Sequence, residues 1–351
     1  MSAEASLHLR SIGVALLPAA AALVVAGGSA AQQQPPRFED RVDVIRVLID
    51  ARVVDGSGEP VRDLGPGDFT VTMDGRRARV ESASWVEGGG VDEIGRPVEA
   101  SDLGGAAPPG RLVVFLFQKD FEPTRMIGLM RMLVETRRFI EGFTPADRIA
   151  VLSFDSHLKV WLDFTSDLRR LDDVLARGIL FQRPDQVEPS EGVSLLWRLD
   201  ASRARRTYTM EQALLMIAGA MAPLPGAKSL VIVGHGFGRY VGGAVTVRDE
   251  YAAARRAFQR GRVAVFALDT TQADRHSLEV GLMQVAEDTG GFFERTNLFA
   301  TRGLERLAGA LTGHYVLFVE RPEGLQAGSH RVEVKVARRG ATVLAKRMVA
   351  G

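Results

Sequence analysis

The chain has 351 residues, of which 46% are hydrophobic and 25% are charged, and its formal net charge is +1. This composition supplies enough apolar side chains for one large core or two smaller ones. The near-neutral charge provides no basic surface for nucleic acid, and the lack of cysteine excludes disulfide bonds and thiolate metal sites. The six histidines are scattered without the spacing typical of metal ligands: His8, His157, His235, His276, His314 and His330.

Residues 1–31 have the order of a secretory signal peptide. His8 and Arg10 precede an apolar run over 12–26, and small residues follow that run up to Ala31. The run is shorter than the roughly 20 residues that a membrane-spanning helix needs, and polar residues come directly after it. We therefore expect cleavage, export to the periplasm or the extracellular space, and no stable membrane span afterwards. An uncleaved membrane anchor is the alternative interpretation.

Residues 32–86 are predicted to form a region of β-strands with tight turns. The segments 42–54, 70–73 and 78–85 alternate apolar and polar side chains, as half-buried strands do. The Asp-Gly pair at 74–75 separates the last two of them and is a strong hairpin signal. Residues 87–110 are rich in glycine, proline and acidic residues, so we expect a mobile linker there.

Residues 111–313 alternate predicted strands and helices, which is typical of a parallel sheet with helices on both faces. An irregular, arginine-rich segment over 178–206 is interpreted as an insertion at one end of this sheet. The predicted strands lie at 111–118, 145–154, 160–167, 228–233, 263–268 and 292–294. The predicted helices lie at 126–140, 166–175, 210–221, 248–260, 278–289 and 298–311.

Residues 314–351 return to β structure, with predicted strands at 314–320, 330–337 and 341–349. In the middle strand the valines 332, 334 and 336 alternate with charged residues, which indicates one buried and one exposed face. Three strands alone leave open edges, and the N-terminal strands have the same need for partners. We expect the two sets to pack together as a small β-sandwich into which the α/β domain is inserted. Two separate β lobes flanking that domain are the alternative.

Two motifs in the α/β domain resemble the von Willebrand factor A (vWA) domain. They are Asp-Arg-Ile-Ala-Val-Leu-Ser-Phe at 147–154 and Trp-Leu-Asp-Phe-Thr-Ser-Asp at 161–167. The segments 47–75, 315–322 and 330–336 are similar to the opening and closing motifs of a family of secreted, acidobacterial-type vWA-related proteins. The resemblance implies a mostly parallel, Rossmann-like sheet of six strands. It also implies ligand binding through a metal above the sheet.

The resemblance implies a metal site that needs one Asp after the first strand of the domain and another after the fourth. Alignment of the strands places Gln118 at the first Asp, with Asp120 and Glu122 at two serine positions of the motif. His235 stands at the second Asp. An amide and an imidazole are neutral and cannot offset the charge of Mg²⁺, which prefers carboxylate oxygens. We therefore expect a degenerate metal-ion-dependent adhesion site and no required cofactor.

The resemblance also implies a threonine from a middle loop, which Thr207 or Thr209 supplies. A rewired site is the alternative, in which Asp120, Glu122 and His235 bind a divalent cation softer than Mg²⁺.

Catalytic motifs are missing from the sequence. The glycine-rich segment 234–238 follows a strand, where an α/β hydrolase has its nucleophile, but it offers no serine or cysteine. We therefore predict an exported, non-enzymatic vWA-type protein that binds a protein or another macromolecule of the cell envelope. Its candidate binding rim comprises Gln118, Asp120, Glu122, Thr207 and His235. The alternatives are a metal-dependent adhesion module with altered ligands and a hydrolase on an α/β scaffold.

Overall fold

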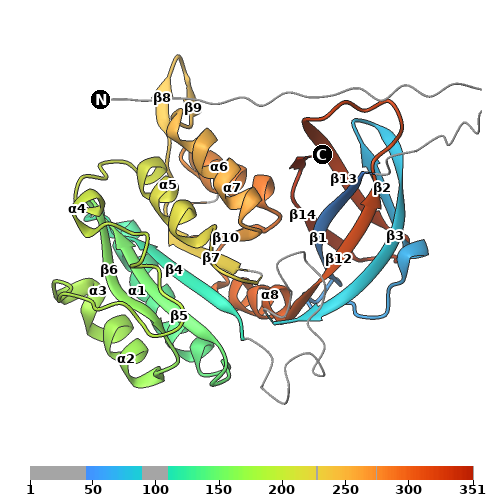
Figure 1. The fold of residues 1–351 in the computed structure, drawn as a ribbon. Helices are drawn as coiled ribbons and strands as arrows, with labels where there is room; N and C mark the ends of the chain where they lie inside the picture. The colour runs from blue at the N-terminus through green and yellow to red at the C-terminus, as the bar shows by residue number, and fades with distance from the viewer. Residues whose placement is uncertain (1–44, 89–109, 227, 274, 351) are drawn as a thin grey trace, which may run out of the picture. The chain divides into compact units, whose positions relative to one another are not determined.

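The computed structural model describes residues 45–88, 110–226, 228–273 and 275–350 (Figure 1). The predicted signal peptide over 1–31 and nearly all of the predicted linker over 87–110 lie outside these residues. Among the helices that the structure describes, none is long and apolar enough to cross a membrane. The described chain is a mixed α/β structure, as predicted, and its two large sheets differ in character.

The first sheet has six strands in the order β11-β10-β7-β4-β5-β6, and only β6 runs antiparallel to its neighbour. Every residue of β4, β7 and β10 is buried, because helices cover both faces. This burial explains the nearly continuous apolar runs in their sequences. The strands are β4 (Leu112–Gln118), β5 (Arg148–Phe154), β6 (Leu158–Thr165), β7 (Lys228–Gly234), β10 (Val263–Asp269) and β11 (Phe293–Arg295).

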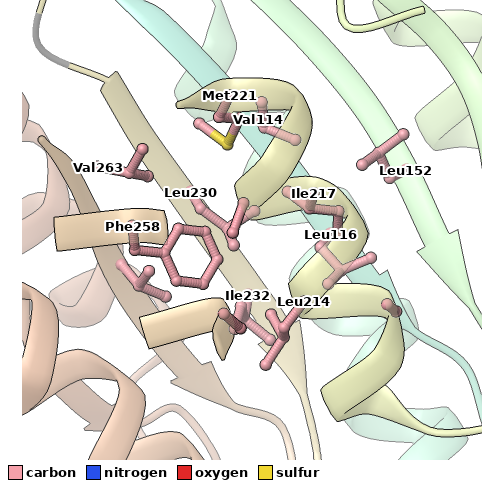
Figure 2. Close-up of a cluster of buried hydrophobic side chains, with 14 of the residues drawn as sticks. Val114, Leu116, Leu152, Leu214, Ile217, Met221, Leu230, Ile232, Phe258 and Val263 are labelled. Carbon is pink, nitrogen blue, oxygen red and sulfur yellow. The ribbon is translucent and has the colours of Figure 1, made fainter. Parts of the chain in front are cut away.

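Alternate side chains of each strand enter different cores, because successive residues of a strand point to opposite faces. Val114 and Leu116 of β4 pack with helices α5 (Met210–Met221), α6 (Glu250–Arg260) and α7 (Glu279–Thr289). Figure 2 shows part of this core, where strand side chains and those of α5 converge beside Phe258. The opposite face packs with α1 (Pro123–Ile140), α2 (Leu168–Asp173), the π-helical turn η2 (Val174–Gly178) and α8 (Ala300–Thr312).

The second sheet has seven antiparallel strands and joins the two ends of the described chain. Its order is β14-β1-β12-β3-β2-β13-β15, so β12 from the C-terminal region lies between β1 and β3 from the N-terminal region. The strands are β1 (Arg46–Val54), β2 (Phe69–Met73), β3 (Arg76–Glu87), β12 (Gly313–Glu320), β13 (Ser329–Val336), β14 (Thr342–Ala345) and β15 (Met348–Ala350). One strand had been predicted over 341–349, but the structure has two there.

The prediction of a two-layered β-sandwich is wrong, because the strands form one curled sheet (Figure 1). Its inner side holds a core that includes Ile49, Met73 and Leu317. Tyr315 lies within this core, where its hydroxyl donates to the carbonyl of Val61 at 3.0 Å. A curled sheet encloses apolar side chains by itself, so no second layer is needed to cover them.

Buried polar contacts connect this curled sheet to the six-stranded sheet. Arg262, which precedes β10, binds the carboxylate of Asp50 in β1 through two guanidinium nitrogens. Arg52 of β1 donates from Nε to the carbonyl of Ala310 in α8 at 3.0 Å. Since buried charges are tolerated only when they are paired, these contacts fix where β1 lies against the α/β region.

The segment between α3 (Ile179–Phe181) and α4 (Ala201–Ala204) has little regular structure, in line with the predicted irregular insertion. Asp163 of β6 holds this segment in place. Its carboxylate accepts the backbone N–H groups of Ser190 and Leu195, each at 2.9 Å. The remaining short elements are η1 (Pro66–Asp68), β8 (Arg239–Val241) and β9 (Ala244–Thr246).

Candidate functional site

The strand order places a topological switch point at the carboxyl ends of β4 and β7. These strands are neighbours in the middle of the sheet, and the chain leaves them toward helices on opposite faces. Open α/β sheets bind ligands at such a topological switch point. Gln118 ends β4, and His235 directly follows β7, so two of the predicted site residues lie at this switch point.

Gln118 uses both ends of its amide to join β4 to the loop after β7. Its Oε1 accepts the backbone N–H groups of His235 and Gly236, each at 3.1 Å. Its Nε2 donates to the carbonyl of Gly236 at 2.8 Å. A Cβ atom at Gly234 would lie 2.6 Å from the Gln118 side chain, so this close approach requires glycine. Gln118 therefore joins the end of β4 to the loop after β7 through three hydrogen bonds to backbone groups.

Asp120 is ion-paired with Arg125, one turn into α1. Burial raises the pKa of the Asp120 carboxyl, but the hydrogen bonds from Arg125 and from the N–H of Glu122 outweigh it and hold the pKa below its usual range. Glu122 is the N-cap of α1, where its carboxylate accepts the N–H of Arg125 at 2.9 Å. Both carboxylates are thus neutralised locally, one by a guanidinium and the other by the helix N-terminus.

His235 is buried, with 7% of its surface exposed, and its Nε2 lies 3.5 Å from Oδ2 of Asp120. Burial lowers the pKa of His235 to about 4, and the charge of Arg125 acts in the same direction. The imidazole is therefore neutral at neutral pH. Its Nδ1 is buried and has no hydrogen-bond partner among the residues that the structure describes.

Thr207 does not join this group through any bond among the described residues. Its hydroxyl accepts the N–H of Leu158 at 2.9 Å and donates to the carbonyl of Ala204 at 2.7 Å. Thr209 is the N-cap of α5 and accepts the N–H of Gln212. The structure thus brings Gln118, Asp120 and His235 together with Glu122 beside them. The hydroxyls of Thr207 and Thr209 form hydrogen bonds with backbone groups.

The alternative metal site of Asp120, Glu122 and His235 stays a prediction, and in the described residues these side chains do not form a compact cluster of ligand atoms. Their ligand atoms do not all come within 4.8 Å of one another, the separation that would let one ion bridge them. The physical reason is that Arg125 and the start of α1 hold the two carboxylates. Asp269, His276 and Glu279 do meet this criterion, alone among the described residues.

This second group was not predicted from the sequence, in which the histidines lack the spacing typical of metal ligands. The His-x-x-Glu pattern at 276–279 was a usable signal only in that it places an imidazole and a carboxylate close together in the sequence, just before and at the start of α7. Asp269 at the end of a strand is the third member, and its position follows from the parallel pairing of β10 with β7.

Exposed aromatic side chains lie around the same end of the sheet. Phe121 follows β4 and is 82% exposed, Tyr208 precedes α5 at 72%, and Tyr240 of β8 follows the β7 loop at 68%. Phe181 is 75% exposed at the end of α3, whose carbonyls at 179 and 180 accept from Lys119 at the end of β4. We call these four residues the aromatic rim.

Comparisons with known proteins give matches to solved structures alone. No family model matches the sequence, and no curated protein is similar to it. A von Willebrand factor type A structure from Catenulispora acidiphila is 8% identical, with a TM-score of 0.41, and the match covers 88% of this chain and 75% of that one. An aerotolerance-related membrane protein from Bacteroides fragilis is 16% identical, with a TM-score of 0.36, and the match covers 57% and 98%.

The conserved hypothetical protein BatB from Bacteroides thetaiotaomicron is 14% identical, with a TM-score of 0.35, over 57% of this chain and 98% of that one. At these identities and TM-scores, similarity carries no functional argument. Any functional conclusion therefore rests on the residues of this chain itself.

Proposed function

We propose that this chain is an exported, non-enzymatic binding protein of the vWA type that recognises another protein through the aromatic rim. The observation that carries the proposal is the exposure of four large aromatic side chains around one end of the sheet. Exposed aromatic residues are enriched at protein interfaces, where they become the buried anchors of the complex. Single exposed apolar residues are common on any surface, but here four exposed aromatic residues belong to loops and short elements at the edge of the sheet where α/β proteins bind their ligands.

The chemistry beneath the rim supports binding in preference to catalysis. The amide of Gln118 makes three hydrogen bonds to backbone groups, and Arg125 is ion-paired with the carboxylate of Asp120. His235 lies beside that ion pair as a neutral imidazole. In this arrangement an arginine supplies the positive charge that the vWA resemblance assigns to a metal ion. The rim is therefore a preformed surface with a degenerate adhesion site at its centre.

The test of this proposal is capture of envelope proteins by the mature chain, with a rim variant and a matched control. The rim variant is Phe121→Ser with Tyr240→Ser, which removes two anchors and leaves the buried residues in place. The control is Val134→Ser on α1, where a 46% exposed apolar side chain lies roughly 16 Å along the helix from its first residue.

Proteins recovered by the wild type and the control, but not by the rim variant, would support the proposal. Equal recovery by all three chains would reject the rim as the binding surface.

A screen for esterase, phosphatase and peptidase activity tests the hydrolase alternative. Activity that disappears in Asp120→Ala or His235→Ala would favour an enzyme. Export is tested by mass spectrometry of the envelope fraction, where we expect a mature chain that begins at or near Gln32.

A further inference from the structure

We propose that Asp269, His276 and Glu279 form a binding site for a divalent transition-metal cation, with Zn²⁺ and Mn²⁺ as its fitting occupants. One ligand atom from each residue lies within 4.8 Å of the other two. Asp269 is the last residue of β10, Glu279 is the first residue of α7, and His276 lies in the connection between them. This site is separate from Asp120, where the vWA resemblance places a metal.

Burial makes this cluster different from an ordinary group of surface acids. Asp269 is fully buried, and Glu279 has only 8% of its surface exposed. The side chain of His276 is 15% exposed, so the site opens to solvent on the histidine side. Two carboxylates close together in a desolvated place favour the binding of positive charge, because water is not there to stabilise them.

Hydrogen bonds already hold the three side chains in a ligating arrangement. The carboxylate of Asp269 accepts the N–H of Thr271 at 2.9 Å and lies 2.7 Å from Nε2 of His276. Glu279 receives two hydrogen bonds from Arg295, each at 2.9 Å. Thr271 and Arg295 orient the two carboxylates from outside the coordination shell, and each carboxylate oxygen keeps a further lone pair for a cation. Nε2 of His276 binds an ion only when its contact with Asp269 is given up.

A second and independent observation concerns unpartnered polar atoms. Of the six buried side-chain nitrogen or oxygen atoms without a hydrogen-bond partner in the described residues, three belong to His235, Thr270 and Thr271. Thr270 and Thr271 directly follow Asp269, and the N–H of Thr270 donates to the carbonyl of Gly234, beside His235. Buried polar atoms without a protein partner indicate an ordered water or ion. Of these three residues, Thr271 contacts the proposed site directly, because its backbone N–H donates to the carboxylate of Asp269.

The ligand types select the cation. An imidazole nitrogen with two carboxylates suits Zn²⁺, Mn²⁺ and similar ions, whereas Mg²⁺ and Ca²⁺ prefer a shell of oxygens alone. Three protein ligands leave coordination positions for water, in contrast to closed structural zinc sites with four. We therefore expect an ion that keeps one or more water molecules on the side of His276.

The experiment is titration of the mature, metal-free chain without an affinity tag, using ZnCl₂, MnCl₂ and MgCl₂ in separate calorimetric runs. We expect one equivalent of Zn²⁺ and of Mn²⁺ to bind, and no binding of Mg²⁺. The variants His276→Ala and Glu279→Gln should each weaken Zn²⁺ binding at least tenfold, the usual effect of losing one ligand or its support. Asp120→Ala and His157→Ala are the controls and should bind as the wild type does. Co²⁺ in place of Zn²⁺ should give a visible absorption spectrum that the His276→Ala variant lacks.

Circular dichroism and the thermal midpoint of each metal-free variant show whether it still folds. Glu279→Gln keeps the shape of the side chain, so this variant should fold and can be titrated with Zn²⁺ even if another variant does not fold. Absence of a one-to-one Zn²⁺ complex in the wild type would overturn the proposal. Zn²⁺ binding that survives in both His276→Ala and Glu279→Gln, or that is lost in Asp120→Ala, would also overturn it by placing the ion elsewhere.

Discussion

Replacing Gln118 with alanine should lower the free energy of unfolding by removing the hydrogen bonds between the end of β4 and the loop after β7. The change removes the acceptor of two backbone N–H groups, those of His235 and Gly236, and the donor to one carbonyl. Gln118 is 93% buried, since only 7% of its surface is exposed, so water cannot freely replace the amide. Each buried group left without a partner costs about 1–3 kcal/mol. Because the two N–H groups share one acceptor, we expect a total loss of about 3 kcal/mol in the free energy of unfolding.

Urea denaturation of the mature chain measures this loss, and hydrogen exchange at the amides of His235 and Gly236 locates it. Gln118→Met separates hydrogen bonding from volume, because methionine fills similar space without an amide, and it should lose nearly as much stability as alanine. Gln212→Ala is the matched control. Gln212 accepts one N–H, from Tyr208 at 2.9 Å, in a more exposed place, so its loss should be about 1 kcal/mol or less. A Gln118→Ala variant as stable as this control, with unchanged exchange at both amides, would refute the reasoning.

Three further outcomes are expected. Burial lowers the pKa of His314 to about 4, so between about pH 6.5 and pH 4 the unfolded chain binds a proton that the folded chain does not. Stability should therefore fall by about 3 kcal/mol as the pH drops through that range, and His314→Gln should remove this part of the slope in urea titrations at several pH values. Asp163→Ala should expose the segment 182–200 to limited proteolysis, because the carboxylate holds the N–H groups of Ser190 and Leu195; an unchanged cleavage rate would contradict this role. Millimolar Mg²⁺ should leave the thermal midpoint unchanged, whereas a rise of several degrees that Asp120→Ala abolishes would show that the vWA position still takes a metal.

The individual elements could be predicted from the sequence, because helix and strand periodicity is a local property of the backbone. The side chains of β13 alternate in exposure as the valines indicated, with Val332 buried, Val334 and Val336 half-buried, and the residues between them exposed. The turn between β2 and β3 has positive φ at Asp74 (48°) and Gly75 (80°), which the Asp-Gly pair predicts. The buried strands at the centre of the sheet were visible as apolar runs.

The arrangement of the β-strands could not be predicted in the same way. A strand with one apolar face has the same pattern in a sandwich and in a curled sheet. The choice depends on which strands pair, and β12 lies between two strands that precede it by more than 200 residues in the sequence. No local pattern specifies a contact of that separation.

At the candidate site, the sequence by itself determined that Gln118, Asp120 and His235 follow the ends of buried strands and that two expected carboxylates are absent. Only the tertiary structure decided what these side chains do. Gln118 bonds to a backbone more than 100 residues away, and Arg125 takes the carboxylate of Asp120. Likewise, the sequence contains Asp269 and the His-x-x-Glu pattern at 276–279, but their burial and their separation depend on how α7 packs against β10. Residue type is a property of the chain, whereas the distance between two side chains and their exclusion from water are properties of the packed fold.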